Sequence, residues 1–174
     1  MSEQHPRPII WAHRPFHFPE DVSEMPSQML HLKVFPSHLA LTLREISKDK
    51  LTTRQDGKWS IQEHLGHLID LEDLPTLRIK EILQGNDTLT PADMSNKNTW
   101  DKNYNEKNLY GLCESFIERR NKLVKLLAGF SDSQLLKWTY HERLHRNMSI
   151  LDLTYFQCQH DHYHHEMIMH LASS

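Results

Sequence analysis

The chain has 174 residues, of which 38% are hydrophobic and 25% are charged, and its formal net charge is −3. This length suits one domain, and the five glycines provide few of the tight turns that an all-β fold needs. Mixed charges without a basic run argue against nucleic-acid binding, and no apolar stretch approaches the ~20 residues of a membrane span. The N-terminus has no charged-then-apolar signal pattern, so we expect a cytoplasmic protein of the all-α class.

The N-terminal region differs from the rest of the chain. Residues 1–26 contain five of the eight prolines and little helical periodicity, which predicts an irregular arm. Residues 27–174 are expected to form the folded domain. Apolar residues at three- and four-residue steps predict a first helix from Pro36 to about Lys48, with a turn or two before it.

The second helix has a sharper start signal, because Ser60 followed by Glu63 is the pattern of a capping box. Apolar residues then recur at helical steps from Ile61 until Gly85 ends the helix. Residues 85–105 are rich in Asn, Asp and Thr and predict a long connection. Loops of this length are often functional or mobile.

A third helix is predicted over residues 106–127, followed by a short helical turn over 131–138. Ser149 and Asp152 then form another capping-box pattern, which opens a fourth helix that runs to about Leu171. Four long helices joined by connections of mixed length predict a four-helix bundle.

Two histidines occupy apolar positions on the fourth helix. His160 and His164 continue a three- and four-residue series that includes Ile150, Leu153 and Ile168. Side chains at i and i+4 lie about 6 Å apart on one helix face, so both imidazoles can reach one ion. Burying an unpartnered polar group costs about 1–3 kcal/mol, and a shared metal ion removes this cost. The alternatives are hydrogen-bonded core histidines, or a metal-free pair that responds to pH.

A third ligand must come from another helix, and the second helix offers His64 and His67. His67 shares a face with Glu63 and Leu71, so its ring can point into the bundle, whereas His64 lies beside Leu65 and stays an alternative. Three imidazoles with a position open to water or substrate form a catalytic zinc site. Similar ligand sets suit nickel, iron or cobalt.

Other candidates stand beside this triad. Cys158 and His162 are also four residues apart, although we interpret their helix face as a second apolar surface or a subunit interface. His141 and His145, in the polar stretch before the fourth helix, are candidates for the border of a pocket. The remaining histidines are expected at the surface: His5, His13, His17, His31 and His38.

A family resemblance rests on three segments. WSIQEHLGHLIDLE (59–72) resembles a motif of the DinB superfamily, HDHYHHEMI (160–168) resembles that family's second signature, and TYHERLHRNMSILDL (139–153) is similar to its YfiT branch. The resemblance spans roughly residues 28–172 and implies a four-helix bundle, often assembled as a homodimer. It also implies one divalent metal ion held by three histidines. The ligand positions of the family fall here on His67, His160 and His164.

Members that resemble this chain are described as metal-dependent hydrolases and as transferases that join a low-molecular-weight thiol to electrophiles. The resemblance therefore implies a small-molecule substrate, zinc or nickel ahead of iron, cobalt or manganese, and a thiol co-substrate. If water attacks, Glu63 is the candidate general base, whereas a metal-bound thiolate needs no base and is slightly preferred. Asp161 with His165 is the alternative ligand pair. The alternative function is that of a non-catalytic metal-binding or stress-associated protein.

Overall fold

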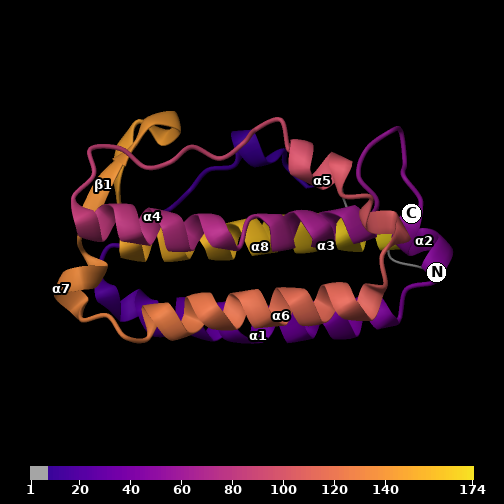
Figure 1. The fold of residues 1–174 in the computed structure, drawn as a ribbon, viewed down its shortest axis with the longest axis horizontal. Coiled ribbons are helices and arrows are strands. Elements are labelled where there is room, and N and C mark those ends of the chain that lie inside the picture. Colours follow the sequence, from indigo (N-terminus) through magenta and orange to yellow (C-terminus); the bar gives the residue numbers. More distant parts are fainter. Residues whose placement is uncertain (1–7) are drawn as a thin grey trace.

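The computed structural model describes residues 8–174; residues 1–7, and with them His5, lie outside the described part. Most of the described chain is helical, and four long helical stretches pack side by side (Figure 1). They are α1 (Met25–Arg44), the consecutive pair α3 (Ile61–Asp70) and α4 (Asp73–Gln84), α6 (Leu109–Leu127) and α8 (Ile150–Ser173). The predicted all-α class and the four-helix bundle are confirmed.

Shorter elements connect these helices. They are η1 (Trp11–His13), η2 (Val22–Glu24), α2 (Lys48–Thr52), α5 (Lys97–Asp101), η3 (Tyr104–Glu106), α7 (Asp132–Leu135), β1 (Trp138–His141), η4 (Glu142–Leu144) and β2 (Arg146–Ser149). The two strands pair antiparallel, with Trp138 opposite Ser149. Sequence patterns did not predict this hairpin, because the inward-facing residues of β1 are Thr139 and His141, which are polar.

The first helix begins earlier than predicted. α1 starts at Met25 rather than near Pro36, and this proline lies inside the helix. A proline there removes one backbone hydrogen bond. Leu32, Phe35 and Leu39 on either side of it are buried in the core. Burial of these side chains offsets the local cost, so tertiary packing overrides the helix-breaking signal.

The second predicted helix is divided into α3 and α4. Ser60 and Glu63 form the expected capping box, and Gly85 ends α4 in the left-handed conformation. Between them the helix is interrupted at Leu71 and the residue after it. In a continuous helix the ring of Pro75 would clash with the carbonyl of Leu71, and Pro75 has no amide hydrogen to donate. The break therefore has a local cause.

The core fills the space between the helices in two clusters of buried apolar side chains. One cluster includes Leu39, Leu65 and Phe116, from three different helices. α8, which opens at the predicted capping box of Ser149 and Asp152, contributes to both clusters. No helix in the described part of the chain is long and apolar enough to cross a membrane.

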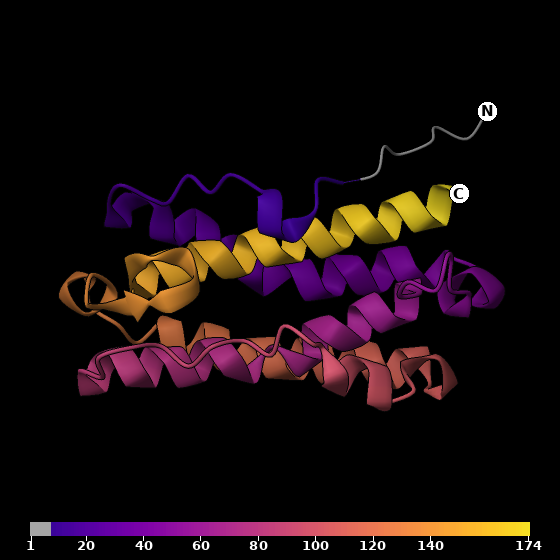
Figure 2. The same ribbon diagram turned by 90° about the horizontal axis from the view of Figure 1, so that it is seen from above.

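Residues 8–24, which precede α1 in the described part of the chain, lie along α8 (Figure 2). Its aromatic rings pack against that helix: Trp11 and Phe16 lie 5.1 Å from the ring of Phe156, centroid to centroid. Arg14 also forms an ion pair with Glu166 on α8. These contacts, with Phe156 and Glu166, bring the N-terminal segment next to the part of α8 that carries His160 and His164.

Candidate metal centre

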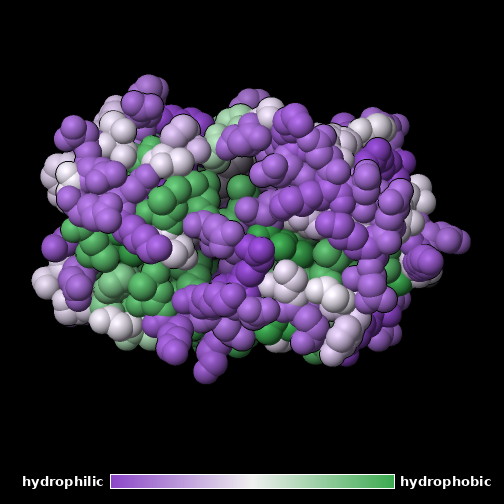
Figure 3. All heavy atoms as spheres, in the orientation of Figure 1, coloured by the Kyte–Doolittle hydropathy of each residue, from purple (hydrophilic) through white to green (hydrophobic). Residues whose placement is uncertain are grey.

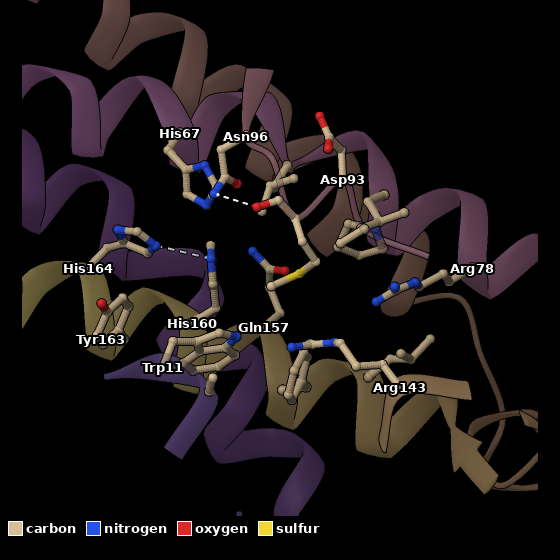
Figure 4. A pocket seen from close by; sticks show the side chains of 18 of the residues that line it. Trp11, His67, Arg78, Asp93, Asn96, Arg143, Gln157, His160, Tyr163 and His164 are labelled. Atoms are coloured by element: carbon tan, nitrogen blue, oxygen red, sulfur yellow. Dashed lines mark hydrogen bonds between the residues drawn. The ribbon is translucent and has the colours of Figure 1, made fainter. Parts of the chain in front are cut away.

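Three histidines from two helices meet inside the bundle. His67 from α3 and His160 and His164 from α8 each offer a ring nitrogen, and these atoms lie within 4.8 Å of one another. The ring centroids of His160 and His164 are 4.4 Å apart, as expected for the i, i+4 spacing, and the ring of His67 lies 4.8 Å from that of His164. The three side chains are buried and face one another (Figure 4).

The orientation of His67 is set by a chain of hydrogen bonds. The hydroxyl of Thr99 on α5 donates to Asp70 Oδ2 over 3.1 Å, and its oxygen lies 3.2 Å from Nδ1 of His67. A hydroxyl has one hydrogen to donate, so Thr99 accepts from His67, whose proton is then on Nδ1. Tyr104 donates to the other oxygen of Asp70 over 2.7 Å. The Nε2 atom of His67 is left without a proton, which is the form that binds a metal.

His64, the other histidine of α3, contacts the ring nitrogen of His164 that faces away from His160. The Nδ1 atom of His164 lies 2.9 Å from Nδ1 of His64, and its Nε2 lies 3.1 Å from Nε2 of His160. When His164 donates its Nδ1 proton to His64, its Nε2 is bare and faces the centre of the triad. His64, the alternative to His67, thus contacts a candidate ligand. The Nδ1 atom of His160 is buried and has no hydrogen-bond partner in the described structure.

The three rings are neutral at pH 7. Burial lowers the pKa of His160 to about 3 and that of His67 to about 4. Burial also lowers the pKa of His164 well below its ordinary value, and the neighbouring histidines add to this effect. A neutral imidazole with one bare nitrogen is the form in which histidine coordinates metals.

The donor set fits a divalent transition metal. Imidazoles suit zinc, nickel, iron and cobalt, whereas magnesium and calcium prefer oxygen ligands. A tetrahedral ion with Zn–N bonds of about 2.0–2.1 Å holds its ligand nitrogens about 3.4 Å apart. The Nε2 atoms of His160 and His164, at 3.1 Å, are close to that separation. No fourth ligand joins this group among the described residues, so coordination positions would stay open.

A family model describing the DinB superfamily matches residues 31–168, a range that includes all three histidines. The chain belongs to the DinB superfamily. The family resemblance in the three sequence segments is thereby confirmed. A search of curated protein sequences finds no match for this DinB-superfamily chain.

A solved structure has the same fold as this member of the DinB superfamily. YfiT from Bacillus subtilis superposes with a TM-score of 0.78 at 19% sequence identity, and the match covers 91% of each chain. That protein is described as a probable metal-dependent hydrolase with an unusual four-helix bundle topology. At this level of identity the comparison establishes the fold of the DinB-superfamily chain.

The triad of this DinB-superfamily chain lines one side of a cavity of about 260 Å³. A hollow is visible near the middle of the face in Figure 3, above the junction of α3 and α4. The walls are mainly apolar and include Trp11, Trp59, Leu71, Leu74, Leu153 and Phe156. Arg78, Asp93, Asn96, Arg143 and Gln157 add polar groups. Sequence reasoning missed Trp11, Arg78 and Arg143, because local periodicity does not show which side chains of the N-terminal arm, α4 and a hairpin loop meet in the same cavity.

One tryptophan covers the triad. The ring of Trp59 lies 4.6 Å from that of His67 and 5.9 Å from that of Trp100, centroid to centroid. Trp138, in contrast, is 60% exposed and lines a different hollow, beside α7. The segment that contains Ser60 and its capping box therefore also places an aromatic ring beside the triad.

Glu63 faces away from the triad. Both oxygens of its carboxylate accept hydrogen bonds from Arg54, and Oε2 also accepts from the amide of Ser60 over 2.9 Å. Burial alone would raise the pKa of Glu63, but the hydrogen bonds from Arg54 and Ser60 lower it. Glu63 lines a separate hollow and does not line the cavity of the triad. Its position matches a helix cap better than a general base.

The alternative ligand pair of Asp161 and His165 is not brought together at the triad. Asp161 is fully buried and accepts two hydrogen bonds from Arg120, over 2.6 and 2.8 Å. Arg120 also binds Glu72, so that three buried charged groups connect α6, α8 and the break before α4. The ring of His165 packs instead near Phe35 on α1.

The other candidates lie outside the triad as well. The thiol of Cys158 is buried and contacts the carbonyl of Gln28 over 3.7 Å, and burial raises its pKa, which disfavours the thiolate that a metal needs. His141 accepts a hydrogen bond from the amide of Leu144, and neither His141 nor His145 lines the cavity. Of the expected surface histidines, His13, His17 and His38 are exposed, and His31 is partly buried beside Asp161.

Proposed function

We propose that this protein binds one divalent metal ion through His67, His160 and His164 and uses it to catalyse a reaction of a small electrophilic substrate. The observation that carries the proposal is the position of the triad: three neutral imidazoles, with no fourth protein ligand in their group, line a largely apolar cavity. A structural zinc ion normally has four protein ligands, whereas a catalytic one keeps a position open. This difference favours an enzyme over a non-catalytic metal-binding or stress-associated protein.

A bound ion would supply Lewis acidity, which lowers the pKa of a coordinated water or keeps a coordinated thiol in its thiolate form. Zinc and nickel fit the donor set best, with iron, cobalt and manganese as further candidates. A water nucleophile needs a base, and the hydrogen bonds of Glu63 leave it unsuited to that role. A thiol nucleophile needs none. We therefore favour a transferase that joins a low-molecular-weight thiol to the substrate, with hydrolysis as the second possibility.

The chain itself contributes orientation and exclusion of water. Thr99 and Asp70 hold the ring of His67, and His64 holds that of His164. The aromatic ring of Trp59 covers the triad on one side, and the ring of Trp11 packs edge-on against His160 with centroids 5.3 Å apart. A water-poor cavity strengthens electrostatic interactions with a developing charge and limits side reactions.

Metal analysis tests the proposed ligands. Protein purified without added metal or chelating resin should contain close to one equivalent of a divalent metal. His160→Ala and His164→Ala should reduce this content strongly, whereas His38→Ala, at an exposed histidine on α1, should leave it unchanged. A parent protein without metal, or equal metal content in all four proteins, would rule out the triad.

Turnover separates the enzyme from the structural alternative. The metal-loaded protein is incubated with 1-chloro-2,4-dinitrobenzene and either cysteine or glutathione, and separately with ester substrates. Conjugation above the rate of the His160→Ala variant supports the transferase, and ester cleavage supports the hydrolase. If the parent binds metal but shows neither reaction across a broad panel of thiols and esters, the non-catalytic function is favoured.

The family resemblance also leads us to expect a homodimer in the cytoplasm that acts on a small molecule. Sedimentation of the purified protein tests the first expectation. A monomer at micromolar concentration would contradict it and leave the metal centre, which is built from one chain, unaffected.

A further inference from the structure

Two arginines line the same cavity as the three histidines, at its other end. Arg78 comes from α4 and is 5% exposed, and Arg143 comes from η4, in the turn of the β-hairpin. Figure 4 shows both guanidinium groups turned towards the cavity, on the far side of Gln157 from the histidines. The cavity is therefore bipolar: candidate metal ligands lie at one end and two cationic groups at the other.

No carboxylate lies within ion-pair distance of these arginines in the part of the chain that the structure describes. Arg78 donates from Nε to the carbonyl of Thr90 over 2.9 Å, and neither guanidinium forms an ion pair. Glu81 lies near enough for its charge to raise the pKa of Arg78, but its carboxylate accepts hydrogen bonds from the amide and hydroxyl of Thr90 and forms no ion pair with Arg78. Asp93 at the rim is exposed and accepts from the amide and hydroxyl of Ser95.

Two like charges that act on each other are unfavourable unless solvent or a counter-ion compensates them; Arg143 is exposed and partly solvated, whereas Arg78 is buried. Burial and the charge of Arg143 together lower the pKa of Arg78 to about 10, although the charge of Glu81 acts in the opposite direction. Buried His141, next to them in the fold, is neutral, because burial and both arginines lower its pKa to about 4. An anion between the guanidinium groups would remove the repulsion. The planar guanidinium suits this role, since it binds carboxylate and phosphate through paired hydrogen bonds.

We propose that Arg78 and Arg143 bind the carboxylate or phosphate group of a small molecule whose reactive end reaches the triad. Gln157 lies between the two ends, and the apolar lining of the cavity, which includes Leu74, Leu153 and Phe156, fits an uncharged spacer. This proposal rests on the proposed function for the chemistry at the reactive end. The anion subsite itself needs no metal and can be tested alone.

The first test uses metal-free protein, because a carboxylate could also coordinate a bound ion directly. Binding of hexanoate, hexyl phosphate and the neutral analogue hexanamide is measured by calorimetry at pH 7.5. We expect at least one of the two anions to bind about tenfold more tightly than hexanamide, the effect of one charge-assisted hydrogen bond or more. The two anions distinguish a carboxylate site from a phosphate site.

Arginine variants show where the preference originates. Arg143→Gln should abolish most of the anion preference and leave the binding of hexanamide unchanged, and Arg78→Gln should act in the same way. Arg146→Gln is the matched control: this arginine is in β2 of the same hairpin and stacks on Phe18, outside the cavity. Equal affinity for anions and amide in the parent would overturn the proposal. So would an anion preference that survives both single variants and the double variant.

A second measurement tests the orientation of the bound molecule. Zinc-loaded protein is titrated with ω-mercapto carboxylates of two to six methylene groups and with the matching mercapto alcohols. At one chain length or more, the carboxylate should bind about tenfold more tightly than the alcohol, and Arg143→Gln should remove the difference. No difference at any length would overturn the bridging orientation. A protein that fails to bind zinc would instead contradict the metal centre, while the metal-free titrations still decide the anion subsite.

Discussion

The rings of His64 and His164 face each other through their Nδ1 atoms, 2.9 Å apart, so that the Nε2 atom of His164 is directed at His160. His64 therefore contacts the candidate ligand His164 on the side of its ring that faces away from His160. Partners of this kind fix the tautomer and the orientation of a metal-binding imidazole.

Replacing His64 by phenylalanine should weaken zinc binding by about 10- to 100-fold without removing the site, because three ligands remain. His64→Gln, which can still accept the proton of His164, should recover part of the affinity. Competition with a zinc chelator measures both values, and the unfolding midpoint of the metal-free variants shows whether stability has changed. If zinc affinity is unchanged in His64→Phe, the contact has no positioning role.

Gly66, also on α3, leaves room for a ring that helps to hold the triad. A Cβ atom at this position would overlap the buried ring of Tyr104, whose hydroxyl holds Asp70 and, through Thr99, His67. Gly66→Ala should therefore cost about 1–3 kcal/mol of folding free energy and also lower zinc affinity.

Gly111→Ala on α6 is the control, because a Cβ atom there meets nothing within 4 Å. Alanine favours a helix by about 0.5–1 kcal/mol relative to glycine, so this variant should be as stable as the parent or more stable. Urea unfolding compares the two substitutions. Equal effects would show that the contact with Tyr104 is not the cause.

Substitutions can distinguish the two candidate ligand pairs of α8, which are His160 with His164 and Asp161 with His165. Asp161→Ala leaves Arg120 buried with only Glu72 as its partner, and we expect a loss of about 3–5 kcal/mol of stability. His165→Ala should be mild, since this ring is only partly buried. Both folded variants should keep one equivalent of zinc. Loss of zinc from His165→Ala, with zinc retained in His164→Ala, would support the alternative pair instead.

Metal-free protein should lose stability in mild acid. The folded-state pKa values of His64 and His160 are lowered to about 3 and those of His67 and His141 to about 4, from an ordinary value of 6.5, mainly by burial. Below pH 6.5 the unfolded chain takes up protons that the folded chain does not bind. The stabilisation is therefore complete above about pH 6.5 and decreases as the pH falls towards 4.

Urea midpoints of the metal-free protein at pH 8, 7, 6 and 5 measure this dependence. The midpoint should be constant between pH 8 and 7 and then fall. His141→Asn, which can still cap η4, should show a shallower fall, because one proton-binding site of the unfolded chain is removed. An identical midpoint at pH 8 and pH 5 would contradict the assignment of neutral buried histidines.

Local sequence patterns were sufficient for much of the fold. The capping boxes at Ser60 and Ser149 form as predicted, because both partners of such a box lie within four residues of each other. The spacing of His160 and His164 has the same local character, since residues four apart on a helix share a face. Pro36 misled the prediction, because its cost inside α1 is offset by core contacts from distant segments.

The sequence by itself therefore determined most of the helical segments, although not the start of α1 or the break between α3 and α4. It also determined the histidine pair on α8 and, through the family resemblance, the bundle and its third histidine. Only the tertiary structure decided that His67 faces the pair on α8 whereas His64 contacts His164 through its Nδ1 atom. Both contacts depend on how α3 is rotated against α8. It also decided that Arg78 and Arg143, from separate elements, share the cavity of the triad. Contacts between distant segments follow from the packing of whole helices, and no local periodicity encodes them.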